Sequence, residues 1–191
     1  KIVGSNVKQF DRDLFAGLMH SFIFWGFMAL LMTTTIVAFE MDVWVKLLQQ
    51  PHFYVGDFYI SVSFVADVMG FVFVLGMAMA LGQRYVTRKD RLWGEHTRLE
   101  DDLFVWALFL LGVGGFLQEG VRIVGAGMPD FETASVVGWT LASIFTSVGM
   151  TPDMAAALYR PLWWSHAFLA LGFVATVPYA KPVHMLTSYA N

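Results

Sequence analysis

The chain contains no cysteine among its 191 residues. Without thiols it forms no disulfide, and it offers no thiolate to a zinc ion or an iron–sulfur cluster within this stretch. Any iron bound here must therefore be held by histidine, methionine or carboxylate side chains. An iron–sulfur cluster that works with this chain has to lie on another chain or in sequence that follows.

Charged residues are also scarce, at 14% of the chain against about 25% in a soluble domain, while hydrophobic residues make up 57%. The 18 Phe and 7 Trp are typical of lipid-facing surfaces and of aromatic belts at membrane interfaces. The net charge of −3 identifies no partner, and we expect no nucleic acid to bind. The composition predicts an all-α integral membrane protein, built as a transmembrane helical bundle.

Four hydrophobic stretches predict four main spans, with interfacial helices between them. The spans are expected at residues 14–39, 59–81, 103–124 and 162–179. Residues 40–58 predict an interfacial helix followed by a loop, and residues 84–98, beginning with Arg84, predict a solvated charged loop. Residues 133–150 are apolar but barely long enough to cross a bilayer, so a five-span bundle stays open.

The distribution of lysine and arginine predicts the orientation of the bundle. Residues 1–13 and the loop at 84–98 carry the excess of positive charge, which marks the cytoplasmic side of a membrane. We therefore expect a multi-pass protein of a prokaryotic cytoplasmic (inner) membrane, with residues 1–13 as a cytoplasmic lead-in. Residues 14–188 are expected to form one membrane domain, and residues 189–191 to begin a C-terminal extension of a longer protein.

Two histidines of the final hydrophobic stretch, His166 and His184, lie 18 residues apart. In a helix this separation is about five turns and about 27 Å, so both imidazoles point the same way, one near each face of a bilayer. If residues 133–150 do not span, His184 reaches the depth of His20 on the first span. Two facing imidazoles at one depth suit a haem iron. If residues 133–150 do span, His20 faces His166 instead. The alternative for His166 and His184 is an interfacial or packing role without a haem.

Three more ionisable residues lie within or at the end of expected spans. Asp67 is a candidate for proton uptake or release at a quinone, because carboxylates inside a membrane are rare and usually functional; its alternative is pairing with a polar side chain. Glu119 and Arg122 share one helix face. They are expected to pair with each other or to border a quinone pocket.

Two stretches carry a resemblance to a known family. The segment SHAFLALGFVATVPYAKPVHMLTSY resembles the final helix of the cytochrome b gamma subunit of respiratory nitrate reductase, and GLMHSFIFWGF resembles the start of its earlier ligand-bearing helix. With HSFIFWGF and the loop around WGEHT, the chain is more similar still to the membrane domains associated with heterodisulfide-reductase-like proteins and electron-transfer-flavoprotein:menaquinone oxidoreductases. The resemblance implies a b-type cytochrome that passes electrons between a cytoplasmic iron–sulfur partner, separate or fused, and the menaquinone pool.

The resemblance also implies haem ligands. His20 and His184 match the axial ligands of the haem nearer the cytoplasm, and His166 matches a ligand of the distal haem. The family has a second distal ligand where this chain has Leu30. One haem b is therefore expected and two are open.

The departure at that position leaves several arrangements for the distal site. The distal haem is absent, or five-coordinate on His166, or bound also by His52, Met28 or Met32. Without that haem, His166 is a candidate to hydrogen-bond a quinone oxygen. Two broader alternatives are a haem-free membrane anchor or transporter-like bundle, and a quinone-reactive subunit without haem.

Overall fold

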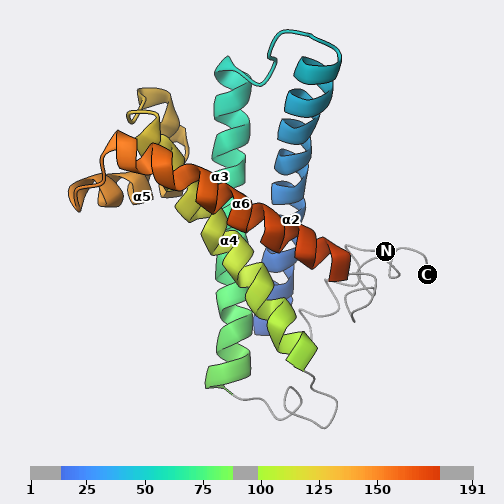
Figure 1. Ribbon diagram of the computed structural model, residues 1–191. Helices are drawn as coiled ribbons and strands as arrows, with labels where there is room; N and C mark the ends of the chain where they lie inside the picture. Colours follow the sequence, from blue (N-terminus) through green and yellow to red (C-terminus); the bar gives the residue numbers. More distant parts are fainter. Residues whose placement is uncertain (1–13, 88–98, 177–191) are drawn as a thin grey trace.

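A computed structural model describes residues 14–87 and 99–176, and every regular element in these two ranges is helical (Figure 1). The all-α prediction is confirmed. In chain order the helices are α2 (Leu14–Ala38), η1 (Phe39–Leu47), α3 (Gly56–Leu81), η2 (Gly82–Val86), α4 (Leu99–Gly125), η4 (Asp130–Ala134), α5 (Val136–Ser147) and α6 (Pro152–Thr176).

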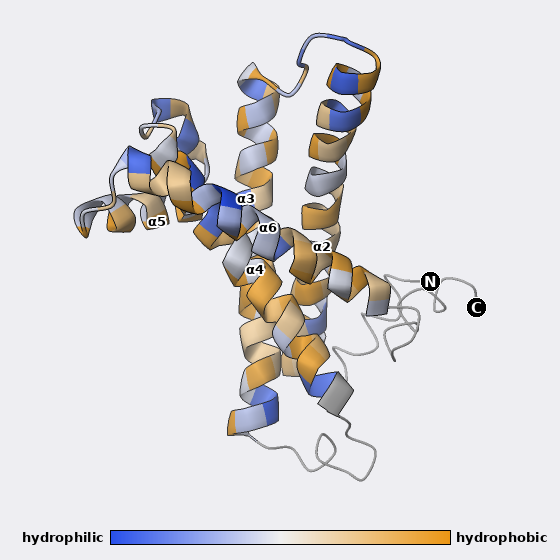
Figure 2. Cartoon of the chain, in the orientation of Figure 1, coloured by the Kyte–Doolittle hydropathy of each residue, from blue (hydrophilic) through white to orange (hydrophobic). Residues whose placement is uncertain are grey.

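Three helices of the described ranges are long and apolar enough to cross a membrane: Leu14–Leu47, Gly56–Val86 and Asp101–Gly125. Their apolar character is visible along α2, α3 and α4 (Figure 2). They correspond to the first three predicted spans. α6, the predicted fourth, is not among them within the described residues.

The boundaries between the first two spans differ from the prediction. No separate interfacial helix follows α2; the chain continues without a break into the π-helix η1, and only residues 48–55 form the connection. Between Ala38 and Leu48 no proline or glycine interrupts the helix, and Pro51 is the first such residue. α3 then begins at Gly56, three residues before the expected Tyr59.

The apolar segment at 133–150 forms a short helix rather than a span. α5 has 12 residues, which is about 18 Å of helix, against a hydrocarbon core about 30 Å thick. It cannot cross the core alone, and this favours the version of the bundle in which 133–150 do not span. α5 packs on α4, and η4 lies beside it against α3.

Arg84 is not part of a solvated loop, contrary to the prediction. It is buried in η2, at the end of the second span, and its guanidinium forms an ion pair with Asp102 at the start of α4. Tyr85 donates a hydrogen bond of 2.9 Å to the same carboxylate, and Trp106 donates one of 3.1 Å to the Tyr85 hydroxyl. Burial of a charge requires such partners, so these contacts tie α3 to α4 at this end of the bundle.

α2 and α3 run side by side and touch through glycine (Figure 1). A Cβ atom at Gly26 of α2 would lie 2.6 Å from the Phe73 Cβ atom of α3, and one at Gly76 of α3 would lie 2.9 Å from the backbone nitrogen of Ile23. Small residues let helix backbones approach closely, which is how membrane helices gain packing energy. The two helices therefore have no room for larger side chains at these positions.

Because α2 and α3 are in such close contact, a single methyl group added between them should lower the stability of the protein. We expect Gly26→Ala and Gly76→Ala each to destabilise the protein by about 1–3 kcal/mol, because the added Cβ overpacks the interface. The matched control is Gly172→Ala in α6, where the added Cβ meets nothing within 4 Å. Thermal unfolding in detergent measures all three; equal midpoints would contradict the contact.

Candidate functional site

The carboxylate of Asp67 caps a helix that lies far from it in sequence. Asp67 is buried in α3, and it accepts hydrogen bonds from the backbone N–H groups of Val137, at 2.8 Å, and Gly138, at 3.0 Å. These amides belong to the first turn of α5, where helix geometry leaves N–H groups unpaired and the helix dipole favours negative charge. Asp67 thus binds a helix N-terminus and not the polar side chain that was the alternative to a functional role.

A second buried carboxylate, Glu132 of η4, binds Arg122 near the end of α4. The guanidinium donates two hydrogen bonds, from Nη1 to Oε1 at 2.6 Å and from Nη2 to Oε2 at 2.8 Å. The hydroxyl of Tyr59, in the first turn of α3, donates a third at 2.8 Å to Oε1. This bidentate geometry gives the strongest type of ion pair, and it joins α3, α4 and η4.

Arg122 therefore has a different main partner from the one predicted. Glu119 Oε1 lies 3.9 Å from Arg122 Nη2, which is an ion-pair contact but longer than a hydrogen bond. Neither Glu132 nor Tyr59 was predicted from the sequence as part of this site. The signal available for Glu132 was indirect: an arginine at the end of an apolar helix needs a carboxylate, and the loop GAGMPDFE supplies one.

The pKa values of Glu132 and Tyr54 both differ from their ordinary values. Burial alone would raise the pKa of Glu132, but the hydrogen bonds and charge of Arg122 outweigh it and hold that pKa below its ordinary value. Tyr54, in the connection before α3, has a raised pKa because burial disfavours its anion. Both side chains therefore keep their usual neutral-pH charge state, with Glu132 ionised and Tyr54 neutral.

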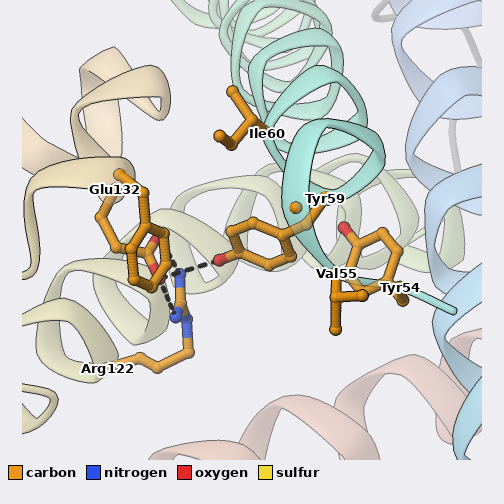
Figure 3. Close-up of a pocket in the computed structure, with 8 residues that line it drawn as sticks. Tyr54, Val55, Tyr59, Ile60, Arg122 and Glu132 are labelled. Carbon is orange, nitrogen blue, oxygen red and sulfur yellow. Dashed lines mark hydrogen bonds and ion pairs between the residues drawn. The ribbon is translucent and has the colours of Figure 1, made fainter. Parts of the chain in front are cut away.

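A cavity of about 440 Å³ opens beside this ion pair. Its lining consists of Tyr54, Val55, Gly56, Tyr59, Ile60, Arg122, Phe131 and Glu132. The ring of Tyr59 lies between the Arg122–Glu132 pair and the side chains of Tyr54 and Val55 (Figure 3). Because α3 begins and α4 ends here, the cavity lies at the end of the spans, with one charged wall and otherwise aromatic and aliphatic walls.

Glu119 lies one turn deeper in α4 than Arg122, against the first turn of α5. A Cβ atom at Gly138 would lie 2.8 Å from the Glu119 Cδ atom, so this carboxyl group packs directly on the backbone of α5. The hydroxyl of the fully buried Ser135 faces the same carboxyl without meeting hydrogen-bond geometry. Glu119 and Asp67 thus approach α5 from two different spans.

His166 packs over two glycines of α4. Its Nδ1 atom lies 3.5 Å from the Cβ position of Gly114, and its Cε1 atom lies 3.7 Å from that of Gly115. Gly114 is 11 residues from the end of α4, or about 17 Å, so this half-buried imidazole lies near the middle of the span. The glycines that interrupt the third span thus provide the surface on which His166 lies.

The other predicted haem ligands are placed as follows. His20 lies on the exposed side of α2, six residues after its start. His184 lies outside the described residues, so the pairing of His20 with His184 stays a prediction. Leu30 packs against the core cluster of Phe73, and Met28 and Met32 are exposed on α2.

His52 is held by a buried carboxylate. Its Nδ1 atom lies 2.6 Å from Oε1 of Glu40, which is 2% exposed in η1. This contact leaves the Nε2 atom of His52 available, the arrangement usual for a histidine that binds a metal through its other nitrogen. Residues 14–87 and 99–176 contain no group of three or more histidine or acidic side chains that could hold a metal ion; a haem iron requires fewer protein ligands.

Comparison with known proteins relates the chain to parts of larger oxidoreductases. It is 34% identical over 188 residues to the EtfAB:quinone oxidoreductase of Syntrophomonas wolfei, covering 94% of this chain and 25% of the relative. It is 24% identical over 192 residues to the probable iron-sulfur-binding oxidoreductase FadF of Bacillus subtilis, covering 96% of this chain and 24% of the relative.

A third relative is a subunit of the dihydromethanophenazine:CoB–CoM heterodisulfide reductase of Methanosarcina barkeri, at 25% identity over 177 residues, covering 92% of this chain and 57% of the relative. No family model and no solved structure matches the chain. The chain therefore spans about a quarter of the first two relatives and just over half of the third. It is similar to segments of proteins named for quinone-linked, iron–sulfur and heterodisulfide oxidoreductases.

The Arg122–Glu132 pair predicts a specific loss of stability. Glu132→Gln should cost about 3 kcal/mol, because it leaves a partly buried guanidinium without its counter-charge. The matched control is Asp130→Asn, an exposed acid in the same helix η4. Thermal unfolding in detergent compares the two, and an equally small effect of both would contradict the role of the pair.

The lowered pKa of Glu132 also predicts a dependence on pH. Because the folded-state pKa lies below the unfolded one, this carboxylate stabilises the fold above its ordinary value of 4.5, and the contribution is lost as the pH falls through the folded pKa. The wild-type unfolding midpoint should therefore fall more steeply below pH 4.5 than that of Glu132→Gln. Parallel curves for the two proteins would show that Glu132 does not contribute.

Proposed function

We propose that the chain is the membrane-embedded electron-transfer part of a quinone-linked oxidoreductase. It passes electrons between a cytoplasmic iron–sulfur partner and a menaquinone-type pool. The observation that carries this proposal is the cavity between α3, α4 and η4, with its aromatic walls and its single guanidinium. The name of the Syntrophomonas wolfei relative, which specifies a quinone, supports the same class of substrate.

The chemistry of the cavity suits a quinone ring. A quinone is flat and apolar, with two carbonyl oxygens that accept hydrogen bonds, and the cavity combines aromatic rings with a donor. Arg122 uses two of its five N–H bonds on Glu132, which leaves donors for a ligand carbonyl. A volume of about 440 Å³ falls within the usual range of ligand pockets. The location at the end of the spans lets an isoprenoid tail extend into lipid.

Haem b is the proposed electron carrier. No cysteine competes for the iron, and imidazoles in an apolar helical sleeve fit the ligand chemistry of a haem b. His20 and His184 are the proposed axial ligands, while His166 and His52 are the candidates for a second haem. When bound, the haem takes up and releases single electrons; the chain supplies the ligands, excludes water and binds the quinone.

The quinone site predicts a loss of binding on substitution of Arg122. We expect Arg122→Lys to raise the Kd for menadione (2-methyl-1,4-naphthoquinone) about tenfold or more, because lysine replaces the planar fork of donors by a single ammonium. Radiolabelled menadione is bound to the full-length protein in nanodiscs, with empty nanodiscs subtracted. Arg160→Lys, an exposed arginine of α6 outside the cavity, should stay within twofold; an unchanged Kd for Arg122→Lys would exclude the cavity.

The haem proposal predicts a b-type spectrum. The full-length protein, produced with haem supplied, should show a reduced-minus-oxidised band that His20→Ala removes or halves. His96→Ala, in the charged loop, is the control and should keep the band. A wild-type protein without any such band, but with menadione bound, would support the quinone-reactive alternative without haem.

A further inference from the structure

The carboxyl groups of Asp67 and Glu119 both reach the first turn of α5, but they differ in the hydrogen-bond donors that surround them. Both oxygens of Asp67 accept hydrogen bonds from backbone amides, those of Val137 and Gly138. Both hydrogen bonds join α3 to the N-terminus of α5, so the contacts of Asp67 suit a fixed anchor of α5.

Glu119 lacks such firm donors. Among the described residues its ion-pair contact is with Arg122 Nη2 at 3.9 Å, beyond hydrogen-bond length. The hydroxyl of the fully buried Ser135 is directed toward it, but no hydrogen bond of this hydroxyl meets the geometric criteria in the described ranges. Buried hydroxyls almost always have a partner, so this one marks a place for a water molecule between Ser135 and Glu119.

Glu119 is not part of the cavity lining, but it neighbours a residue that is. Glu119 is three residues from Arg122 on α4, so both side chains emerge on the same helix face, and Arg122 lines the cavity. The charged groups that face Glu119 are Asp67 from α3, Arg122 on its own helix and Glu132 from η4. Two of these three are acidic side chains, so carboxyl groups are concentrated around Glu119.

Resting on the function proposed above, we infer that Glu119 is the proton-exchanging group of the cavity, whereas Asp67 is a positioning residue that holds α5. On reduction, a quinone takes two electrons from the iron–sulfur partner and two protons. One proton comes from the Glu119 carboxyl group through an intervening water, and one comes from water at the cavity mouth. Both C=O groups become C–OH, and the Glu119 carboxylate regains its proton from water; oxidation of a quinol reverses each step.

The test uses menadiol, the reduced form of menadione, with the full-length protein in nanodiscs. Stopped-flow absorbance follows the reduction of the protein's own redox centres across a range of pH. We expect Glu119→Gln to slow this reduction about 100-fold and to flatten its pH profile, because general acid–base groups contribute about that factor. Menadione binding should stay within twofold, and Glu119→Asp should restore most of the rate.

The outcomes separate this inference from the function on which it rests. If the wild-type protein neither binds menadione nor is reduced by menadiol, the proposed function and the inference both fall. If the wild-type protein does both while Glu119→Gln keeps the wild-type rate and pH profile, only the role of Glu119 is overturned. Loss of menadione binding in Glu119→Gln would show that Glu119 shapes the cavity, and this also overturns its role as a proton carrier.

Discussion

The arrangement of the helices depends on hydrogen bonds and ion pairs that stabilise the buried charged side chains. Moving an unpaired carboxylate or guanidinium out of water is too costly for an apolar helical protein, so each one requires donors or acceptors in fixed positions. Asp67 obtains them from the N-terminus of α5, and Glu132 obtains them from Arg122 and Tyr59. These requirements determine where the short helices lie.

The cavity follows from the same constraint. Because Asp67 anchors α5 on α3, and Glu132 ties η4 to both α3 and α4, the segment between the third and last helices is fixed beside the ends of two spans. Phe131 and Glu132 are thereby brought to Tyr59 and Arg122, which lie on separate helices. A polar wall thus remains inside an otherwise apolar end of the bundle, where a ligand with carbonyl groups can be oriented.

Glycine has a complementary role on the helix surfaces that carry no charge. Gly26 and Gly76 bring α2 and α3 together, whereas Gly114 and Gly115 form the surface under the imidazole of His166. The first pair of glycines makes space for the backbone of the neighbouring helix. The second pair makes space for a half-buried histidine side chain. Close packing and histidine placement are therefore achieved by the same residue type.

The sequence alone determined the class of the protein and the location of the apolar helices, because hydropathy and helix length are properties of contiguous residues. It also singled out Asp67, Glu119 and Arg122, since ionisable groups stand out in apolar segments. Only the tertiary structure decided their partners: the amides that bind Asp67 are 70 and 71 residues away in sequence. Such partners depend on how helices pack, and no local pattern encodes that, which is why Glu132 and the surroundings of His166 emerged from the fold.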